Sequence, residues 1–283
     1  MTSRQYNLGV THPSLTVGLY IFGDEILSGK REDKHFQKTR EILGSRGLAL
    51  SWVHYLGDDP QRCVDALSHS FASQDVVFGC GGIGSTPDDH TRQAAAKALG
   101  RPLVLHPEAR SLIAQRCEES GQPLTPERLR MGEFPEGSDI VPNPYNKIPG
   151  FSIHRHFFLP GFPVMAWPMM EWVLDTHFQQ AFQSLAELDQ SFMVAGVYEA
   201  AVTPLMEEIH RTFPDLKIYS LPAAPVPGDA SAKRFLELGL KLSGGRATQD
   251  PSSLTRLDEA YSRLRAGALA LGGEVLEERK VRR

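Results

Sequence analysis

The stretch "GCGGIGSTPDDH" occupies residues 79–90 and follows an apolar segment, "DVVFGC" at residues 75–80. The apolar segment has the length and the β-branched residues of a buried strand. A glycine-rich loop between a strand and a helix lets backbone N–H groups approach an anion such as phosphate. The two aspartates that end the stretch repel phosphate. The stretch therefore indicates a site that combines an anion-binding loop with carboxylate side chains.

The order strand, loop, helix is repeated around this stretch. The segments "LTVGLYIF" (residues 15–22) and "LALSWVHYL" (residues 48–56) have the pattern of two further strands. The expected helices start near residues 33, 59 and 87. Three alternations predict an α/β fold with a doubly wound, mostly parallel sheet. Because ligands bind at the carboxyl edge of such sheets, the loops at residues 23–33 and 79–89 are expected to converge on one crevice.

The remainder of the chain predicts a second, smaller domain. Residues 125–134 form a short capped helix by pattern, and residues 135–151 are expected to be a long loop. A strand near residue 156 precedes a helix that Pro168 either kinks or starts. The order βαββαβ then predicts a ferredoxin-like domain. The expected domains are residues 1–185 and 186–283.

Bulk properties exclude several classes of protein. The 283 residues carry a net charge of −4 and contain 41% hydrophobic residues, without a basic run that indicates nucleic acid. No apolar run reaches the length of about 20 residues that spans a membrane, and the N-terminus has no signal-peptide pattern. The three cysteines are far apart, which fits a reducing compartment. We expect a cytoplasmic protein that binds neither nucleic acid nor membranes.

The aspartates admit two interpretations. Residues 86–89 fit the first four positions of a helix, with Asp89 closing a capping box. Asp33 fits the cap of its own helix equally well, and Asp24 could cap a turn. Alternatively, a carboxylate holds a divalent cation such as Mg²⁺, which bridges it to phosphate and removes the repulsion. The expected convergence of the two loops favours a metal role for Asp33 and Asp89 together.

Two further readings concern the same region. Gly79, Gly81 and Gly84 satisfy G-x-G-x-x-G, which is typical of dinucleotide-binding folds. That pattern normally follows the first strand, whereas here it follows the third, so a nicotinamide-dependent dehydrogenase is disfavoured. Lys147 in "NPYNKIPG" is a candidate phosphate contact, although a solvated lysine is the commoner case.

Four segments of the chain occur in a recognisable order: "GDEILSG" (residues 23–29), "GGIGSTPDDHT" (residues 81–91), "PNP…PG" (residues 142–150) and "LPGFP" (residues 159–163). Together they resemble the molybdopterin-binding domain family, which includes MoaB, Mog and the CinA-type proteins. Their order is most similar to that of the CinA type, without the amidase domain that ends longer CinA proteins. The resemblance implies a doubly wound domain whose anion pocket takes a pterin or nucleotide phosphate.

The resemblance also implies roles for individual residues. Asp33 and Asp89 are the implied catalytic residues, and with Asp24 they are the implied ligands of a divalent metal, Mg²⁺ being expected. The expected phosphate-binding residues are Gly81, Gly82, Gly84, Ser85, Thr86, Lys147 and Gly161. CinA-type domains are similar to enzymes that cleave the pyrophosphate of ADP-ribose. The alternative is a non-catalytic protein that binds molybdopterin or a nucleotide, and in either case a homo-oligomer is expected.

The chain departs from the family pattern at two places. Residues 146–150 read "NKIPG" where the family has "GTAPG", and Asn146 can adopt the left-handed conformation that the glycine supplies. Residues 164–166 read "VMA" where the family has Ser-Glu-Met, so a carboxylate is lost at Met165. This loss slightly favours the binding protein over the hydrolase.

Overall fold

The computed structural model of the chain describes residues 15–182, 187–223, 235–243, 247–248 and 250–282. It divides into two compact units, Met1–Phe182 and Gln183–Arg283. The boundary predicted between residues 185 and 186 lies outside the described residues. Each unit has its own hydrophobic core and is described by itself.

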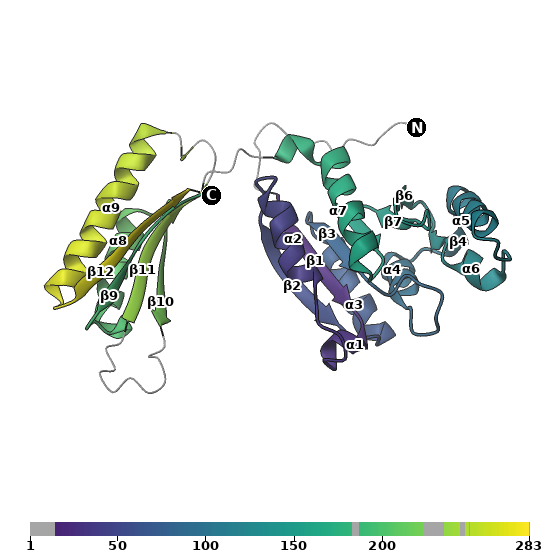
Figure 1. Ribbon diagram of the computed structural model, residues 1–283, viewed down its shortest axis with the longest axis horizontal. Helices are drawn as coiled ribbons and strands as arrows, with labels where there is room; N and C mark the ends of the chain where they lie inside the picture. Colours follow the sequence, from purple (N-terminus) through teal and green to yellow (C-terminus); the bar gives the residue numbers. More distant parts are fainter. Residues whose placement is uncertain (1–14, 183–186, 224–234, 244–246, 249, 283) are drawn as a thin grey trace. The chain divides into compact units, whose positions relative to one another are not determined.

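The first unit contains a six-stranded, mostly parallel sheet, which confirms the predicted α/β fold (Figure 1). In spatial order its strands are β2 (Leu50–Leu56), β1 (Val17–Phe22), β3 (Val76–Cys80), β8 (His156–Leu159), β7 (Gly150–Ile153) and β6 (Asp139–Val141). The first four are parallel, and β7 and β6 continue the sheet antiparallel. Strands β4 (Leu103–Leu105) and β5 (Glu133–Pro135) form a separate pair.

Helices cover both faces of this sheet. They are α1 (Asp24–Leu27), α2 (His35–Gly44), α3 (Pro60–Phe71), α4 (Thr91–Leu99), α5 (Pro107–Glu119), α6 (Pro126–Arg130) and α7 (Pro163–His177), followed by the 3₁₀ turn η1 (Gln179–Ala181). Leu19 and Ile21 of β1 face the core under α2 and α7, whereas Tyr20 and Phe22 face the core under α3 and α4. This alternation with apolar residues on both sides is what a buried parallel strand requires.

Helix starts follow the predicted chemistry in two cases and not in a third. Asp59 caps α3 by accepting a hydrogen bond of 2.8 Å from the amide of Arg62, with Pro60 at the first helical position. Thr125 caps α6 in the same way. The prediction for α4 was wrong, because this helix begins at Thr91 rather than near residue 87.

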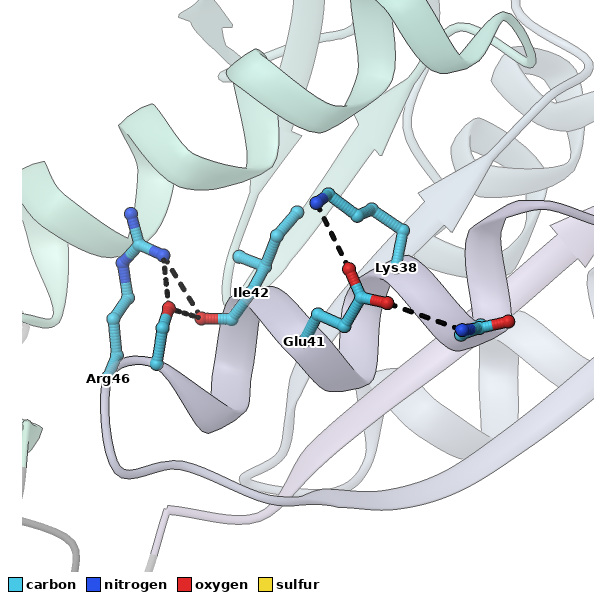
Figure 2. Close-up of polar contacts among 6 residues, drawn as sticks. Lys38, Glu41, Ile42 and Arg46 are labelled. Atoms are coloured by element: carbon cyan, nitrogen blue, oxygen red, sulfur yellow. Dashed lines mark hydrogen bonds and ion pairs between the residues drawn. The ribbon is translucent and has the colours of Figure 1, made fainter. Parts of the chain in front are cut away.

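Helix α2 links the sheet to α7. At its exposed side the ammonium of Lys38 lies 3.1 Å from the carboxylate of Glu41 (Figure 2). Beyond its C-terminal end the guanidinium of Arg46 donates to the carbonyl of Ile42 at 3.0 Å (Figure 2). Arg46 also makes two bonds of 2.6 and 2.8 Å to Asp175 on α7, and this guanidinium holds the pKa of Asp175 below its usual range. The C-terminal end of α2 is thereby fixed to α7.

The segment at residues 135–151 is only in part the loop that was predicted, because residues 142–149 are a loop between two strands. It contributes β6 and part of β7, and β7 forms a hairpin with β8 through a two-residue turn at His154 and Arg155. His154 adopts a positive φ of 56°, as tight hairpin turns require. Neither turn residue is Asn or Gly, so the usual sequence signal for such a turn is missing. Pro168, which was expected either to kink or to start the following helix, lies inside α7.

The second unit has the predicted βαββαβ order. Its elements are β9 (Leu188–Ala195), α8 (Glu199–Thr212), β10 (Lys217–Ala223), β11 (Phe235–Leu242), α9 (Pro251–Ala270) and β12 (Glu274–Arg282). They form an antiparallel sheet of order β10-β11-β9-β12, with β10 and β12 at the edges. Among the helices of the described residues, none has both the length and the apolar character needed to cross a membrane.

Candidate functional site

A cavity of about 920 Å³ opens at the carboxyl edge of the first sheet. Its walls are the segment after β1 (residues 23–35), the glycine loop after β3 (residues 81–89), the turn after β8 (residues 160–163), and parts of residues 143–149. The two loops expected to converge therefore do line one cavity. The volume is within the range of small-molecule sites.

The glycine loop has a conformation that only glycine can adopt at several positions. Gly81 and Gly82 have φ values of 106° and 69°. A Cβ on Gly82 would lie 2.1 Å from the hydroxyl of Thr91, and a Cβ on Gly84 would lie 2.5 Å from the carboxylate of Asp89. The glycines thus permit a close turn of the backbone against the start of α4.

Three carbonyls of this loop are held by the first two residues of α4. The hydroxyl of Thr91 donates to the carbonyl of Gly81 at 3.0 Å, and its amide donates to Gly82 at 3.0 Å. The guanidinium of Arg92 donates to the carbonyl of Gly84 at 2.6 Å. In a trans peptide the N–H group points opposite to the carbonyl. The amides that follow these carbonyls therefore point away from α4.

The amides that follow these carbonyls belong to Gly82, Ile83 and Ser85, which line the cavity. Within the described parts of the chain, the N–H groups of Gly82, Ile83, Gly84 and Ser85 donate to no backbone or side-chain acceptor. Backbone donors need an acceptor, and here solvent or a ligand must supply it. Consecutive free amides on a glycine loop form a binding site for an anion.

Arg92 places a buried positive charge behind this loop. Its side chain is 1% exposed, and besides Gly84 it donates to the carbonyl of Arg130. Burial lowers the pKa of Arg92, while the carboxylates of Asp89 and Glu133 oppose that shift. No role was predicted for Arg92, because an arginine in the first turn of a helix is ordinarily solvated.

Asp89 lines the cavity, as expected, but not as part of a helix. Its carboxylate accepts hydrogen bonds from the amide of Thr86 at 2.8 Å and from the Thr86 hydroxyl at 2.5 Å. The amide of Asp89 in turn donates to the carbonyl of Thr86 at 3.1 Å. Residues 86–89 are thus a closed turn, and Asp88 and Asp89 are both at the cavity wall.

Asp33 and Asp24 lie elsewhere. The carboxylate of Asp33 caps α2 by accepting from the amides of His35 (2.7 Å) and Phe36 (3.2 Å), and it also accepts from the hydroxyl of Tyr55 (2.8 Å). Burial and this carboxylate raise the pKa of Tyr55 to about 12. Neither Asp33 nor Asp24 is among the residues that line the cavity. The placement of Asp33 favours its capping role.

Asp58 is a cavity residue that the sequence analysis overlooked. It exchanges hydrogen bonds with Asp24, each carboxylate accepting from the other's amide at 3.1 Å. Burial raises the pKa of Asp58, and the charges of Asp24, Glu25 and Asp88 raise it further. Its signal is the "GDD" at residues 57–59, where only the start of a helix near residue 59 was predicted. Across the described residues, no three His, Cys, Asp or Glu side chains are arranged to hold a metal ion.

Of the remaining residues expected to bind phosphate, three line the cavity and one does not. Ser85, Thr86 and Gly161 line the cavity. Lys147 does not, and its ammonium forms an ion pair with Glu119 of α5. Lys147 also has the left-handed conformation, with φ of 65°, that was expected of Asn146. Asn146 instead uses its carboxamide oxygen to accept from the amide of Ile148 at 3.0 Å, which shapes this loop.

The first unit is thus an α/β domain whose glycine loop presents amides without a partner in the described chain to a cavity, with the buried Arg92 behind the loop. Residues 18–180 match the family described as probable molybdopterin binding domain. A CinA-like protein from Syntrophotalea carbinolica is 30% identical over 211 residues, which are 71% of this chain and 51% of that protein. A protein from Caldivirga maquilingensis is 31% identical over 194 residues, 67% of this chain and 74% of that protein.

One solved structure has the same fold. The protein CinA with unknown function from Thermoplasma acidophilum superposes with a TM-score of 0.51 at 24% identity, covering 56% of this chain and 97% of that one. The chain belongs to the molybdopterin-binding domain family and is a CinA-type member of it. It spans about half the length of the Syntrophotalea relative.

Proposed function

We propose that the first unit binds the phosphate groups of a phosphorylated pterin or nucleotide at residues 81–86. The observation that carries this proposal is the set of free amides at Gly82, Ile83, Gly84 and Ser85 within the described chain. Phosphate oxygens are strong acceptors that fit such a loop. The buried charge of Arg92 behind the loop adds a favourable field for an anion.

The other walls of the cavity fit the organic part of such a ligand. Apolar side chains line it beside the glycine loop, including Ile26, Met131, Ile148 and Met165. A ligand that combines phosphate with a flat heterocyclic ring matches a cavity whose walls contain both polar groups and apolar side chains. Membership of the molybdopterin-binding family supports a pterin or nucleotide as that ligand.

Calorimetric titration tests this function. The protein is titrated with inorganic pyrophosphate and with ADP-ribose, and then with ADP-ribose in the presence of excess pyrophosphate. We expect both to bind and pyrophosphate to compete with ADP-ribose, because both use the same amides. Absence of binding by both probes, or binding without competition, would show that the loop is not the phosphate site.

A second candidate function is hydrolysis of the pyrophosphate bond with the help of a divalent cation. Its support is the carboxylates that share the cavity with the glycine loop, namely Glu25, Asp58, Asp88 and Asp89. Mg²⁺ is commonly held by one or two carboxylates and completed by substrate phosphates, so a site need not exist before the substrate binds. Such a cation neutralises charge between carboxylate and phosphate and polarises the phosphoryl group.

In this proposal Asp89 keeps the role expected from the sequence, and Asp58 takes the place given to Asp33. Both carboxylates would hold the cation, since both line the cavity. The amides of Gly82 to Ser85 bind phosphoryl oxygens, where negative charge builds up as the bond to the leaving group breaks. Asp33 supports the site by fixing the start of α2.

Hydrolysis is tested by release of AMP and ribose 5-phosphate from ADP-ribose with and without Mg²⁺. Asp58→Asn and Asp89→Asn are each expected to lower Mg²⁺-dependent turnover at least ~10-fold, the effect of losing ~1.4 kcal/mol. Asp65→Asn is the control, because Asp65 lies outside the cavity on α3 and bonds to Gln61. Binding of ADP-ribose without any turnover of the wild-type protein would instead identify a binding protein.

A further inference from the structure

Phe162 is a large aromatic side chain that is exposed at the cavity. It is 55% exposed, and it lines the cavity beside the glycine loop. Its backbone is fixed, because its carbonyl accepts from the amides of Met165 and Ala166, both at 2.9 Å, at the start of α7. Pro163 occupies the first position of that helix. The ring therefore projects from a rigid position but is left out of the core.

Arg31 covers this ring from the opposite loop. Its guanidinium carbon lies 5.9 Å from the centroid of the Phe162 ring, and both residues line the cavity. The amide of Arg31 donates to the carbonyl of Glu25 at 2.9 Å, which closes the segment after β1. Its side chain is 63% exposed, and apart from the Phe162 ring its partner among the described residues is Glu25, in a long ion pair of 3.8 Å. The guanidinium is thus free to move away from the ring.

The pair lies next to the proposed phosphate site. A Cβ on Gly161, the residue before Phe162, would be 3.4 Å from the Cα of Gly81. The amide of Gly81 donates to the carbonyl of Leu159 at 2.9 Å, so the two turns are joined directly. The carbonyl of Gly161 is in addition 3.0 Å from a ring nitrogen of His35. An aromatic surface and a set of phosphate-binding amides therefore adjoin each other on rigid backbone.

We propose that Phe162 and Arg31 form a ring-binding subsite, in which the planar heterocycle of the phosphorylated ligand stacks on Phe162 beneath the guanidinium of Arg31. Aromatic rings and guanidinium planes both stack on heterocycles, adenine and pterin alike. The subsite selects ligands that carry such a ring over those that carry only phosphate or sugar phosphate. This inference rests on the phosphate-binding function proposed above and names the part of the ligand that gives specificity.

Variants that change the ring but not the charge test this subsite. Phe162→Leu keeps an apolar side chain without a ring, Phe162→Tyr restores the ring, and Arg31→Lys keeps the charge without the plane. Val164→Ala is the control, because Val164 lies two residues after Phe162 in the first turn of α7 and is 52% exposed but does not line the cavity. Calorimetric titrations use ADP-ribose for an adenine ring, neopterin triphosphate for a pterin ring, and inorganic pyrophosphate for phosphate alone.

Phe162→Leu is expected to weaken binding of at least one ring-bearing probe by about fivefold or more. Arg31→Lys is expected to weaken binding of the same probe as well. Pyrophosphate should bind all variants within about twofold, and Phe162→Tyr and Val164→Ala should match the wild type. The probe that Phe162→Leu affects more identifies the ring. If wild-type and Phe162→Leu proteins bind every probe alike, the subsite is refuted while the phosphate site stands. If the wild type does not bind pyrophosphate, the phosphate site itself fails, and the subsite with it.

Discussion

Replacing Arg92 with methionine removes the buried cation behind the glycine loop while keeping a side chain of similar length. The change deletes the charge-assisted bonds to the carbonyls of Gly84 and Arg130. Each such bond contributes roughly 1.5–3 kcal/mol, and the variant leaves two partly buried carbonyls without this donor. Part of this loss is offset, because the methionine does not require a charge to be buried. We expect a net loss of about 2–4 kcal/mol in the free energy of unfolding.

The loss should be visible in thermal unfolding and in ligand binding. For a unit of this size 1 kcal/mol shifts the melting temperature by roughly 2–4 °C, so Arg92→Met should melt roughly 5–15 °C below the wild type. Because Arg92 orients the peptide between Gly84 and Ser85, pyrophosphate affinity measured well below the melting transition should also fall by about 10-fold or more. Arg92→Lys keeps the charge but cannot bridge both carbonyls, and it should be intermediate in both measurements.

Thermal unfolding by circular dichroism and calorimetric titration with pyrophosphate provide these values. A variant that melts like the wild type would contradict the energetic role of the two bonds. A variant that is destabilised but binds pyrophosphate with wild-type affinity would show that Arg92 supports the fold without orienting the loop amides.

Three further predictions concern other parts of the chain. Gly82→Ala should abolish pyrophosphate binding and lower the melting temperature, because the new Cβ would meet Thr91 and the φ of Gly82 is 69°. The control is Gly44→Ala in helix α2, which has open space around it and should be neutral or stabilising. Equal effects of the two variants on the melting temperature would contradict this prediction. The pKa of Asp58 is raised in the folded state, so its carboxylate lowers the free energy of unfolding once the pH rises through that pKa. Asp58→Asn should therefore have a higher melting temperature than the wild type near neutral pH in the absence of metal. This difference in melting temperature should vanish below about pH 4, where the carboxyl group is protonated in both states. Because the edge strand β12 pairs only with β9 among the described residues, we expect a homo-oligomer, and light scattering that gives a monomer mass over a wide concentration range would refute it.

The sheet of the first unit could be predicted because its signals are local. Apolar strands with residues facing two cores, Asp59 as a cap and Pro60 at the start of α3 each specify their element within a few residues. The start of α4 could not be placed, because residues 86–89 satisfy the pattern of a helix start. In the structure Asp89 bonds back to Thr86 and closes a turn instead. A local pattern for capping does not distinguish these two outcomes.

The convergence of the two loops on one cavity was predicted, but the set of carboxylates that line this cavity was not. The convergence of the loops followed from the direction of parallel strands, and Asp89 and the glycines do line the cavity. Asp33 and Asp58 both lie between a strand and the helix that flanks the sheet after it, and only the turn geometry decides that Asp33 caps α2 while Asp58 lines the cavity. The roles of Arg92 and Phe162 could not be predicted from the sequence. The burial of Arg92 and the exposure of Phe162 depend on contacts between segments that are distant in the sequence.

The amides of residues 82–85 can be observed one by one, and this tests the central claim most directly. In ¹⁵N-resolved nuclear magnetic resonance, titration with inorganic pyrophosphate is expected to shift the amide signals of Gly82, Ile83, Gly84 and Ser85 more than those of any other residues in the first unit. The reason is that these donors have no acceptor in the described chain and line the cavity. Saturable binding of pyrophosphate that leaves these four signals unmoved, with the shifts concentrated elsewhere, would contradict the account.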